Sequence, residues 1–175
     1  MSEKPEDVDE IRRHCYHEAG HAICMLVGGI GVRGIVISEA ASFVDPAPNT
    51  GNAYYRLRAA LAGAIAQQRF THLPPEAMHV AGDAEPINMY LGWLETDTTP
   101  RAKVRADAES DAEFVVERYW EAIIVLAEHL AALPVVDSER RMSGDEFRDL
   151  VLPLVRKIKN GPSQKSSDDA TKGAL

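Results

Sequence analysis

The chain is poor in the features that mark secreted and disulfide-stabilised proteins. Among its 175 residues there are two cysteines. Cys15 and Cys24 fall on opposite faces of one predicted helix, so they cannot pair with each other. We therefore expect buried free thiols and a reducing, cytoplasmic location.

Positive charge is also scarce. Lysine and arginine total 19 against 27 aspartate and glutamate residues, which gives a net charge of −8 and a pI of about 5.2. A protein that binds nucleic acid or an anionic membrane without specificity needs the opposite balance. We expect neither partner for this chain.

Long hydrophobic runs are missing. The longest, Ala19 to Val32, contains His21 and is shorter than the ~20 residues that a membrane helix needs. The first residues, Met1 to Asp7, are polar and acidic, unlike a signal peptide. The hydrophobic content of 45% still suffices for a core. We expect one domain over residues 1–160, and a disordered tail over 161–175, which have no apolar face.

What the sequence does contain is the pattern HExxH, at His17-Glu18-Ala19-Gly20-His21. On a helix, residues four apart share a face, so both imidazoles can bind one zinc ion. Glu18 lies on the same side and can take a proton from a water activated by the metal. Gly20 leaves room for a neighbouring backbone. The pattern predicts a peptide-hydrolysing zinc site.

The motif lies in a convincing helix, predicted from about Val8 to about Val27. Asp7 or Asp9 can cap its start, and Gly28-Gly29 ends it. Two imidazoles and a carboxylate would be unwelcome beside an apolar core unless a metal accompanied them. The apolar positions at helical spacing are Ile11, Cys15, Ala19, Ala22, Ile23, Leu26 and Val27.

The rest of the sequence predicts a mainly α fold with a small β element. Val32 to Ser38 has the composition of a strand, which either offers its edge to a substrate or is buried and structural. Glu39 to Asn52 is typical of a loop. The predicted helices are Ala53 to Phe70, Asp83 to about Leu94, about Pro100 to Leu133, and a last one from the capping box of Ser143 and Glu146 through Ile158, with a kink or a restart at Pro153.

A catalytic zinc usually has three protein ligands, so one must come from outside the motif. Residue types alone do not choose among the candidates, and Asp83 can equally be the N-cap of its helix. His14, one turn before His17, is better explained as a histidine behind the ligands or in solvent than as a ligand itself. The candidates are His14, Asp45, His72, His79, Asp83, Glu85 and His129.

The segment Tyr16 to Ala22 resembles the signature of the FtsH family, the ATP-dependent membrane zinc proteases. The resemblance continues in order along the chain. Val32 to Ile37 resembles the family's strand after the motif helix, and Leu61 to Gln68 its "LAGRAAEE" helix. Gly82 to Glu85 falls where the family has "SND", whose aspartate is the third ligand. The long helix and Met142 to Phe147 resemble the closing helices.

The resemblance implies a zinc metallopeptidase in which His17, His21 and Asp83 bind Zn²⁺ and Glu18 is the general base. Two departures matter: Gln67-Gln68 replaces an acidic pair, and no P-loop or transmembrane segment accompanies the peptidase part. We expect a peptide or unfolded protein as substrate. The resemblance also suggests a separate ATPase as partner and assembly into a homo-oligomer. The alternatives are a non-catalytic binding or assembly module and a hydrolase of non-peptide amides.

Overall fold

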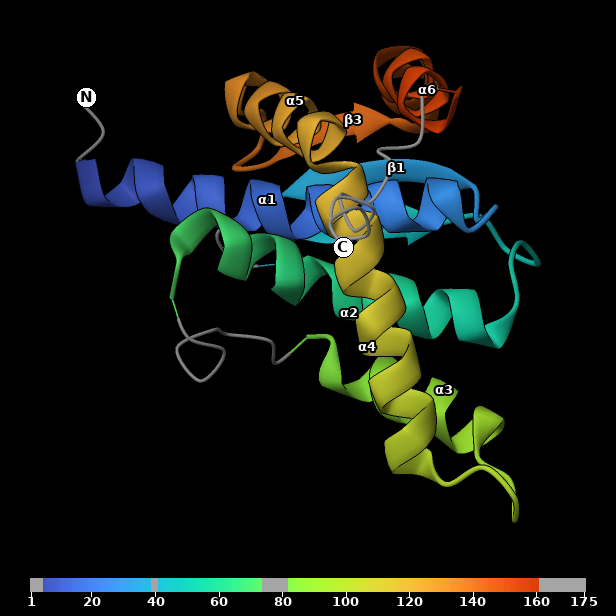
Figure 1. The fold of residues 1–175 in the computed structure, drawn as a ribbon. Helices are drawn as coiled ribbons and strands as arrows, with labels where there is room; N and C mark the ends of the chain where they lie inside the picture. The colour runs from blue at the N-terminus through green and yellow to red at the C-terminus, as the bar shows by residue number, and fades with distance from the viewer. Residues whose placement is uncertain (1–4, 39–40, 74–81, 161–175) are drawn as a thin grey trace, which may run out of the picture.

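The computed structural model describes residues 5–38, 41–73 and 82–160, with side chains from residue 10 onward. The fold is mainly helical with a small three-stranded antiparallel sheet, as the sequence predicted (Figure 1). The predicted tail, residues 161–175, lies outside what is described. The predicted caps Asp7 and Asp9 lie within the first helix, which begins at Pro5, so neither is its N-cap. The described elements are α1 (Pro5–Val27), β1 (Val32–Ile37), β2 (Phe43–Pro46), α2 (Ala53–Thr71), α3 (Ala84–Leu94), α4 (Arg101–Arg118), α5 (Trp120–Ala132), β3 (Arg140–Ser143) and α6 (Gly144–Asn160).

Helix α1 runs through the middle of the molecule and carries the motif. It begins at Pro5, three residues before the predicted start, a position that suits proline. It ends where predicted: Gly29 takes a left-handed φ of 72°, and the N–H of Ile30 returns to the carbonyl of Met25. Both cysteines are buried free thiols, as expected.

Helix α2 packs lengthwise against α1 (Figure 1). Its start is capped by Asn52, whose side chain accepts from the N–H of Tyr55 at 2.9 Å. The two backbones approach closely at Gly20: a Cβ there would lie 2.6 Å from the carbonyl oxygen of Ala62. The predicted role of Gly20 is confirmed, and this closeness places α2 directly beneath the motif.

The sheet has the strand order β2-β1-β3, and both pairings are antiparallel. Two of the three strands were not predicted. Strand β2 lies inside the predicted loop 39–52, because only four residues pair with β1, too few to show an alternating pattern. Strand β3 consists of Arg140–Ser143, whose polar composition gives no strand signal. Of the two interpretations of β1, the structure supports the buried one: β1 is central, and β2 is at the edge.

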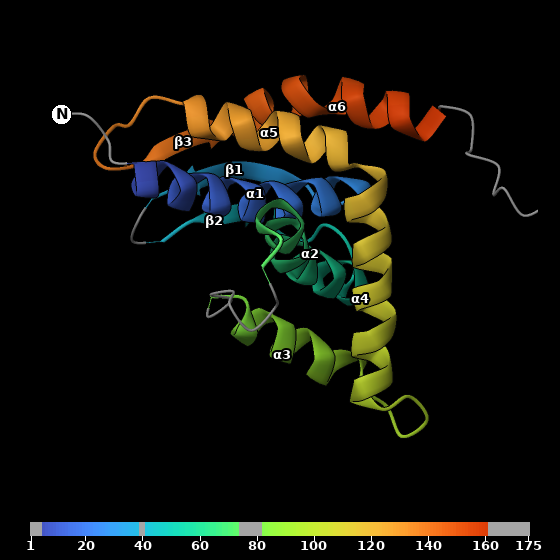
Figure 2. The ribbon, with the colours of Figure 1, turned by 60° about the vertical axis from the view of Figure 1, so that its left-hand side comes forward.

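The prediction of a single long helix over 100–133 was wrong, because the chain turns sharply at Tyr119, between α4 and α5 (Figure 2). Tyr119 has φ −106° and ψ 21°, outside the helical region. Before the turn, α4 packs on α2, and after it α5 packs on α1. The apolar spacing continues unbroken through Val115, Tyr119, Ile123 and Leu126, so the sequence periodicity could not reveal a change of partner.

The last helix, α6, begins with the predicted capping box. The N–H of Ser143 donates to Glu146 at 2.8 Å, and the N–H of Glu146 donates to the Ser143 hydroxyl at 3.3 Å. The helix continues past Pro153 to Asn160 as one element. Across the described residues, no helix is both long and apolar enough to cross a bilayer.

Candidate metal centre

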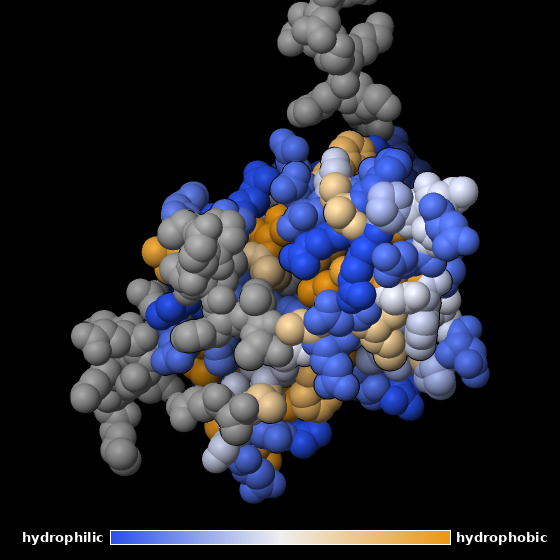
Figure 3. All heavy atoms as spheres, turned by 90° about the horizontal axis from the view of Figure 1, so that it is seen from below, coloured by the Kyte–Doolittle hydropathy of each residue, from blue (hydrophilic) through white to orange (hydrophobic). Residues whose placement is uncertain are grey.

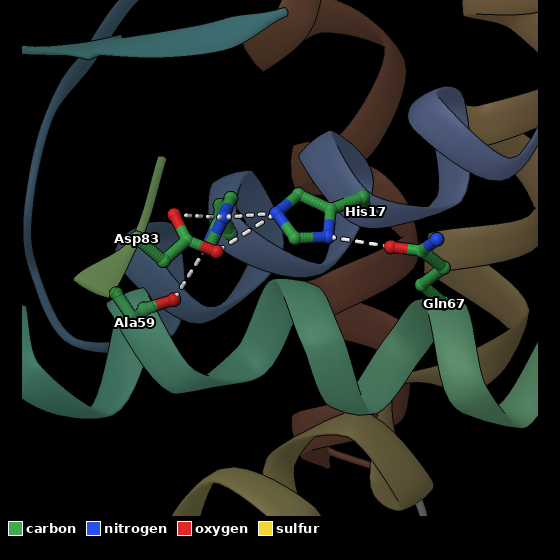
Figure 4. A network of polar contacts seen from close by, with 5 residues as sticks. His17, Ala59, Gln67 and Asp83 are labelled. Atoms are coloured by element: carbon green, nitrogen blue, oxygen red, sulfur yellow. Dashed lines mark hydrogen bonds and ion pairs between the residues drawn. The ribbon is translucent and has the colours of Figure 1, made fainter. Parts of the chain in front are cut away.

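The two motif histidines meet as the spacing predicted. His17 and His21 lie one turn apart on the face of α1 that looks toward α2, and their Nε2 atoms are 2.9 Å apart (Figure 4). His21 is almost completely buried, at 6% exposure, and His17 is half-buried. Both rings therefore present the same nitrogen to one point between the helices.

Asp83 completes this cluster from a distant part of the chain. Its Oδ2 lies 2.9 Å from Nε2 of His17, and its Oδ1 lies 3.2 Å from Nε2 of His21 (Figure 4). Asp83 is also the residue before α3, but its side chain makes no capping hydrogen bond. The Asp83 side chain therefore does not cap α3.

The far nitrogen of each imidazole is held by α2. Nδ1 of His17 lies 2.9 Å from Oε1 of Gln67, and Nδ1 of His21 lies 2.7 Å from the carbonyl oxygen of Ala59. Both oxygens are acceptors, so each Nδ1 carries the proton and donates it. Nε2 of each ring is then the nitrogen that faces Asp83. Partners of this kind fix the tautomer of metal-binding histidines.

The cluster has more acceptors than it has protons to share. With Nδ1 of His17 donating to Gln67, its Nε2 faces Asp83 Oδ2 as one acceptor against another. That buried oxygen has no hydrogen-bond partner among the described residues. A second proton on His21, at Nε2, satisfies its contact with Asp83 Oδ1, but the contact between His17 Nε2 and Asp83 Oδ2 still has no proton. Two nitrogens and a carboxylate oxygen around one point are the ligand set of catalytic zinc, so the residues fit the metal.

The pKa values of His21 and Asp83 are shifted in opposite directions. Burial lowers the pKa of His21, but the Asp83 carboxylate, with Glu18 and the Ala59 carbonyl, outweighs it and brings the pKa to about 9. Burial raises the pKa of Asp83, but the two imidazoles beside it, His17 and His21, outweigh burial, so its pKa falls below the usual range. Asp83 is therefore a carboxylate at neutral pH, and His21 holds a proton that a metal must displace.

Glu18 lies beside the cluster, as predicted for a base. It is 4% exposed, and it lines a cleft of about 570 Å³ with His17, His21 and Asp83. Burial raises the pKa of Glu18, while the two histidines lower it and Asp83 raises it further. A carboxylate with a raised pKa is a stronger base than an exposed one.

The cleft is bounded by the sheet edge. Phe43, Val44 and Pro46, all from β2, line it opposite the helices. The outer side of β2 pairs with no other strand in the part of the chain that is described. An open strand edge beside a cleft can pair with an extended peptide.

Among the residues that the structure describes, the other predicted ligand candidates do not join the cluster. His14 is one turn away, lines the cleft, and has its Nδ1 3.5 Å from the Ser42 hydroxyl. Asp45 pairs with Arg33, and Glu85 is exposed. His72 and His129 lie outside the described group of potential ligands. His79 falls outside the described residues.

Two residues of the site were missed as functional by sequence reasoning. A Cβ at Gly63 would overlap the imidazole of His21, so glycine clears the space for that ring. Gln67 was noted as a departure from an acidic pair, and the available signal was its position four residues after Gly63 on the same helix face.

Comparison with known proteins adds no family assignment. A scan against protein-family models finds no match, and a search of curated proteins finds none either.

Proposed function

We propose that this protein is a zinc-dependent metalloendopeptidase of the FtsH type, without an ATPase of its own. One observation carries the proposal: Nε2 of His17, Nε2 of His21 and the Asp83 carboxylate converge with more acceptors than protons, beside a buried glutamate in a cleft. A structural zinc site needs four closed ligands and no base, whereas three ligands with an adjacent carboxylate are typical of catalysis.

Zinc bound at this point supplies a Lewis acid and lowers the pKa of water toward ~7. The chain's own residues do the rest. Gln67 and Ala59 keep both histidines in the tautomer that ligates. Glu18 takes the proton of the attacking water and returns it to the leaving amine. The β2 edge aligns the substrate backbone across the cleft as an added strand.

The order of the segments supports the same assignment. The motif helix, the strand after it, the helix that carries Gly63 and the aspartate before α3 follow one another as they do in FtsH-type peptidases. Here the third ligand is the residue that this resemblance implies, and the described contacts bring it to both histidines.

The test is cleavage of casein, an unfolded protein, by the zinc-loaded chain without ATP. Glu18→Gln removes the base and keeps the ligands, so we expect cleavage to fall by 10²-fold or more while zinc binding persists. Glu121→Gln is the matched control, because Glu121 is exposed on α5. Zinc binding without Glu18-dependent cleavage of any peptide would overturn the proposal and favour a non-catalytic module.

A further inference from the structure

Helix α3 is the least buried apolar element among those described. Its sequence is AEPINMYLGWL, and within it only Leu91 is fully buried. Ile87 and Leu94 pack in part against the core on the side of Leu91. On the other side, Met89 is 41% exposed and Trp93 is 64% exposed. Large apolar side chains left open to water together mark an interaction surface.

Met89 and Trp93 belong to one stripe on α3 that begins beside the candidate metal centre and includes the half-buried Pro86 and Tyr90, of which Tyr90 also packs against the core. At 100° per residue, Pro86, Met89, Tyr90 and Trp93 fall within an arc of about 100° on α3. Pro86 and Tyr90 line the same cleft as His17 and Glu18. The rings of Tyr90 and Trp93 meet edge to face with centroids 5.5 Å apart. We call these four residues the α3 stripe; it extends the cleft outward along the helix.

The charged residues of α3 and of the chain just after it are all acidic, whereas Arg13 and Arg56 line the cleft from α1 and α2. No lysine or arginine occurs between Arg69 and Arg101. Glu85, Glu95 and Asp97 are exposed near the stripe. Arg101 contacts α3 through Asn88, which projects about 160° away from Tyr90. Figure 3, seen from below the view of Figure 1, shows apolar groups in orange open among hydrophilic ones on this side of the molecule. A complementary occupant is therefore apolar and basic.

A second copy of the chain is a poor occupant. Helix α3 is about 16 Å long, and one stripe along it covers far less than the ~800 Å² per partner of a stable interface. Two copies would also bring their acidic residues together. A transient ligand suits the surface better.

We propose that the α3 stripe is a docking surface for the substrate polypeptide, and that it selects segments whose apolar side chains are flanked by lysine or arginine. This inference rests on the proposed function for its account of the cleft. The substrate class it names is the unfolded polypeptide of mixed apolar and basic composition, held next to the bond to be cut.

Binding can be measured apart from cleavage in the Glu18→Gln protein, by fluorescence anisotropy of two labelled peptides. One alternates leucine and phenylalanine with lysine, and the other has glutamate in place of each lysine. We expect the basic peptide to bind at least tenfold more tightly, and salt to reduce the difference. Trp93→Ala should weaken its binding about tenfold, equivalent to about 1.4 kcal/mol.

The matched control is Phe114→Ala, since Phe114 is similarly exposed, at 60%, but lies on α4. Equal binding of both peptides, or equal losses in the Trp93 and Phe114 variants, would overturn the inference. So would a dimer in sedimentation that Trp93→Ala dissociates.

A cleavage assay separates this inference from the proposed function. With Glu18 intact, Trp93→Ala should raise KM for a long basic substrate about tenfold, with kcat unchanged, and should leave a short peptide unaffected. Cleavage with no such dependence on Trp93 would overturn the docking surface and leave the peptidase standing. Selective binding without any cleavage would keep the docking surface and remove the peptidase.

Discussion

The three ligands of the candidate metal centre are supported very unequally. His21 lies between two packed helices, with its ring against Gly63 and its Nδ1 on a backbone carbonyl. Asp83 comes from the start of α3, which buries only Leu91 within its length. Two ligands are thus positioned by the core, and the third depends on an element with little burial of its own. The metal should therefore matter more to α3 than to α1.

The largest expected effect tests this directly. Zinc at a thousand times its Kd should stabilise the folded protein by about 4 kcal/mol. The gain in hydrogen-exchange protection should include the amides of α3, because Asp83 reaches the site only when α3 is in place. Chemical denaturation and hydrogen exchange with and without zinc measure both quantities. Asp83→Asn is the control that should lose both gains, and an unchanged α3 in the wild type would contradict the comparison.

Two glycine substitutions sharpen the contrast. In Gly63→Ala the new methyl group overlaps the His21 ring, so we expect a loss of about 1–3 kcal/mol in stability and weaker zinc binding. In Gly92→Ala, on α3, a Cβ meets nothing within 4 Å, and the higher helix propensity of alanine should add up to about 1 kcal/mol. Thermal unfolding of the pair is the measurement. Similar losses in both variants would mean that α3 is packed as tightly as α2.

Gln67→Glu tests how α2 holds His17, one of the two candidate ligands that the core positions. A glutamine can accept or donate, whereas a carboxylate only accepts, and it adds negative charge near the cation. We expect zinc affinity to rise about tenfold, or about 1.4 kcal/mol, and the metal-free protein to be less stable because Gln67 is buried at 9% exposure. Calorimetric titration gives the affinity. Gln68→Glu, one residue on and outside the site, should change neither, and an equal rise there would reduce the effect to net charge.

His21 and Asp83 should contribute to stability with opposite dependence on pH. The pKa of His21 is raised to about 9. Its contribution to the metal-free protein is fully present below pH ~6.5 and is lost as the pH rises through about 9. The lowered pKa of Asp83 gives a contribution present above ~4 and lost as the pH falls. Zinc must displace the His21 proton, so its affinity should rise from pH 7 toward 9, by at most about tenfold per unit. Affinity that is constant over this range would contradict the protonation assigned to His21.

Much of this arrangement could be predicted from local sequence. The HExxH spacing fixes two histidines and a glutamate on one side of a helix, and Gly28-Gly29 and the Ser143 capping box mark their helix ends correctly. The predictions that failed have one cause: these features depend on tertiary contacts, which local sequence does not show. The turn at Tyr119 depends on which helix each half packs against, and β2 and β3 exist because β1 lies between them.

The same limit applies to the candidate site. Residue types left seven candidates for the third ligand, and a resemblance selected Asp83 before any geometry was known. The roles of Gln67 and Gly63 depend on where α2 lies relative to α1, which no periodicity states. The sequence patterns thus identify what the site is made of, and the packing of α2 identifies how it is held.

The long separation of the ligands along the chain has a consequence for biosynthesis. His17 and His21 leave the ribosome early, followed by both strands β1 and β2 and the whole of α2, and only then by Asp83. A nascent or partly unfolded chain therefore holds two histidines and a glutamate without the third ligand. The proposed hydrolytic centre can form only once Asp83 and the helix after it have been made, so a chain that stops before Asp83 holds no complete site.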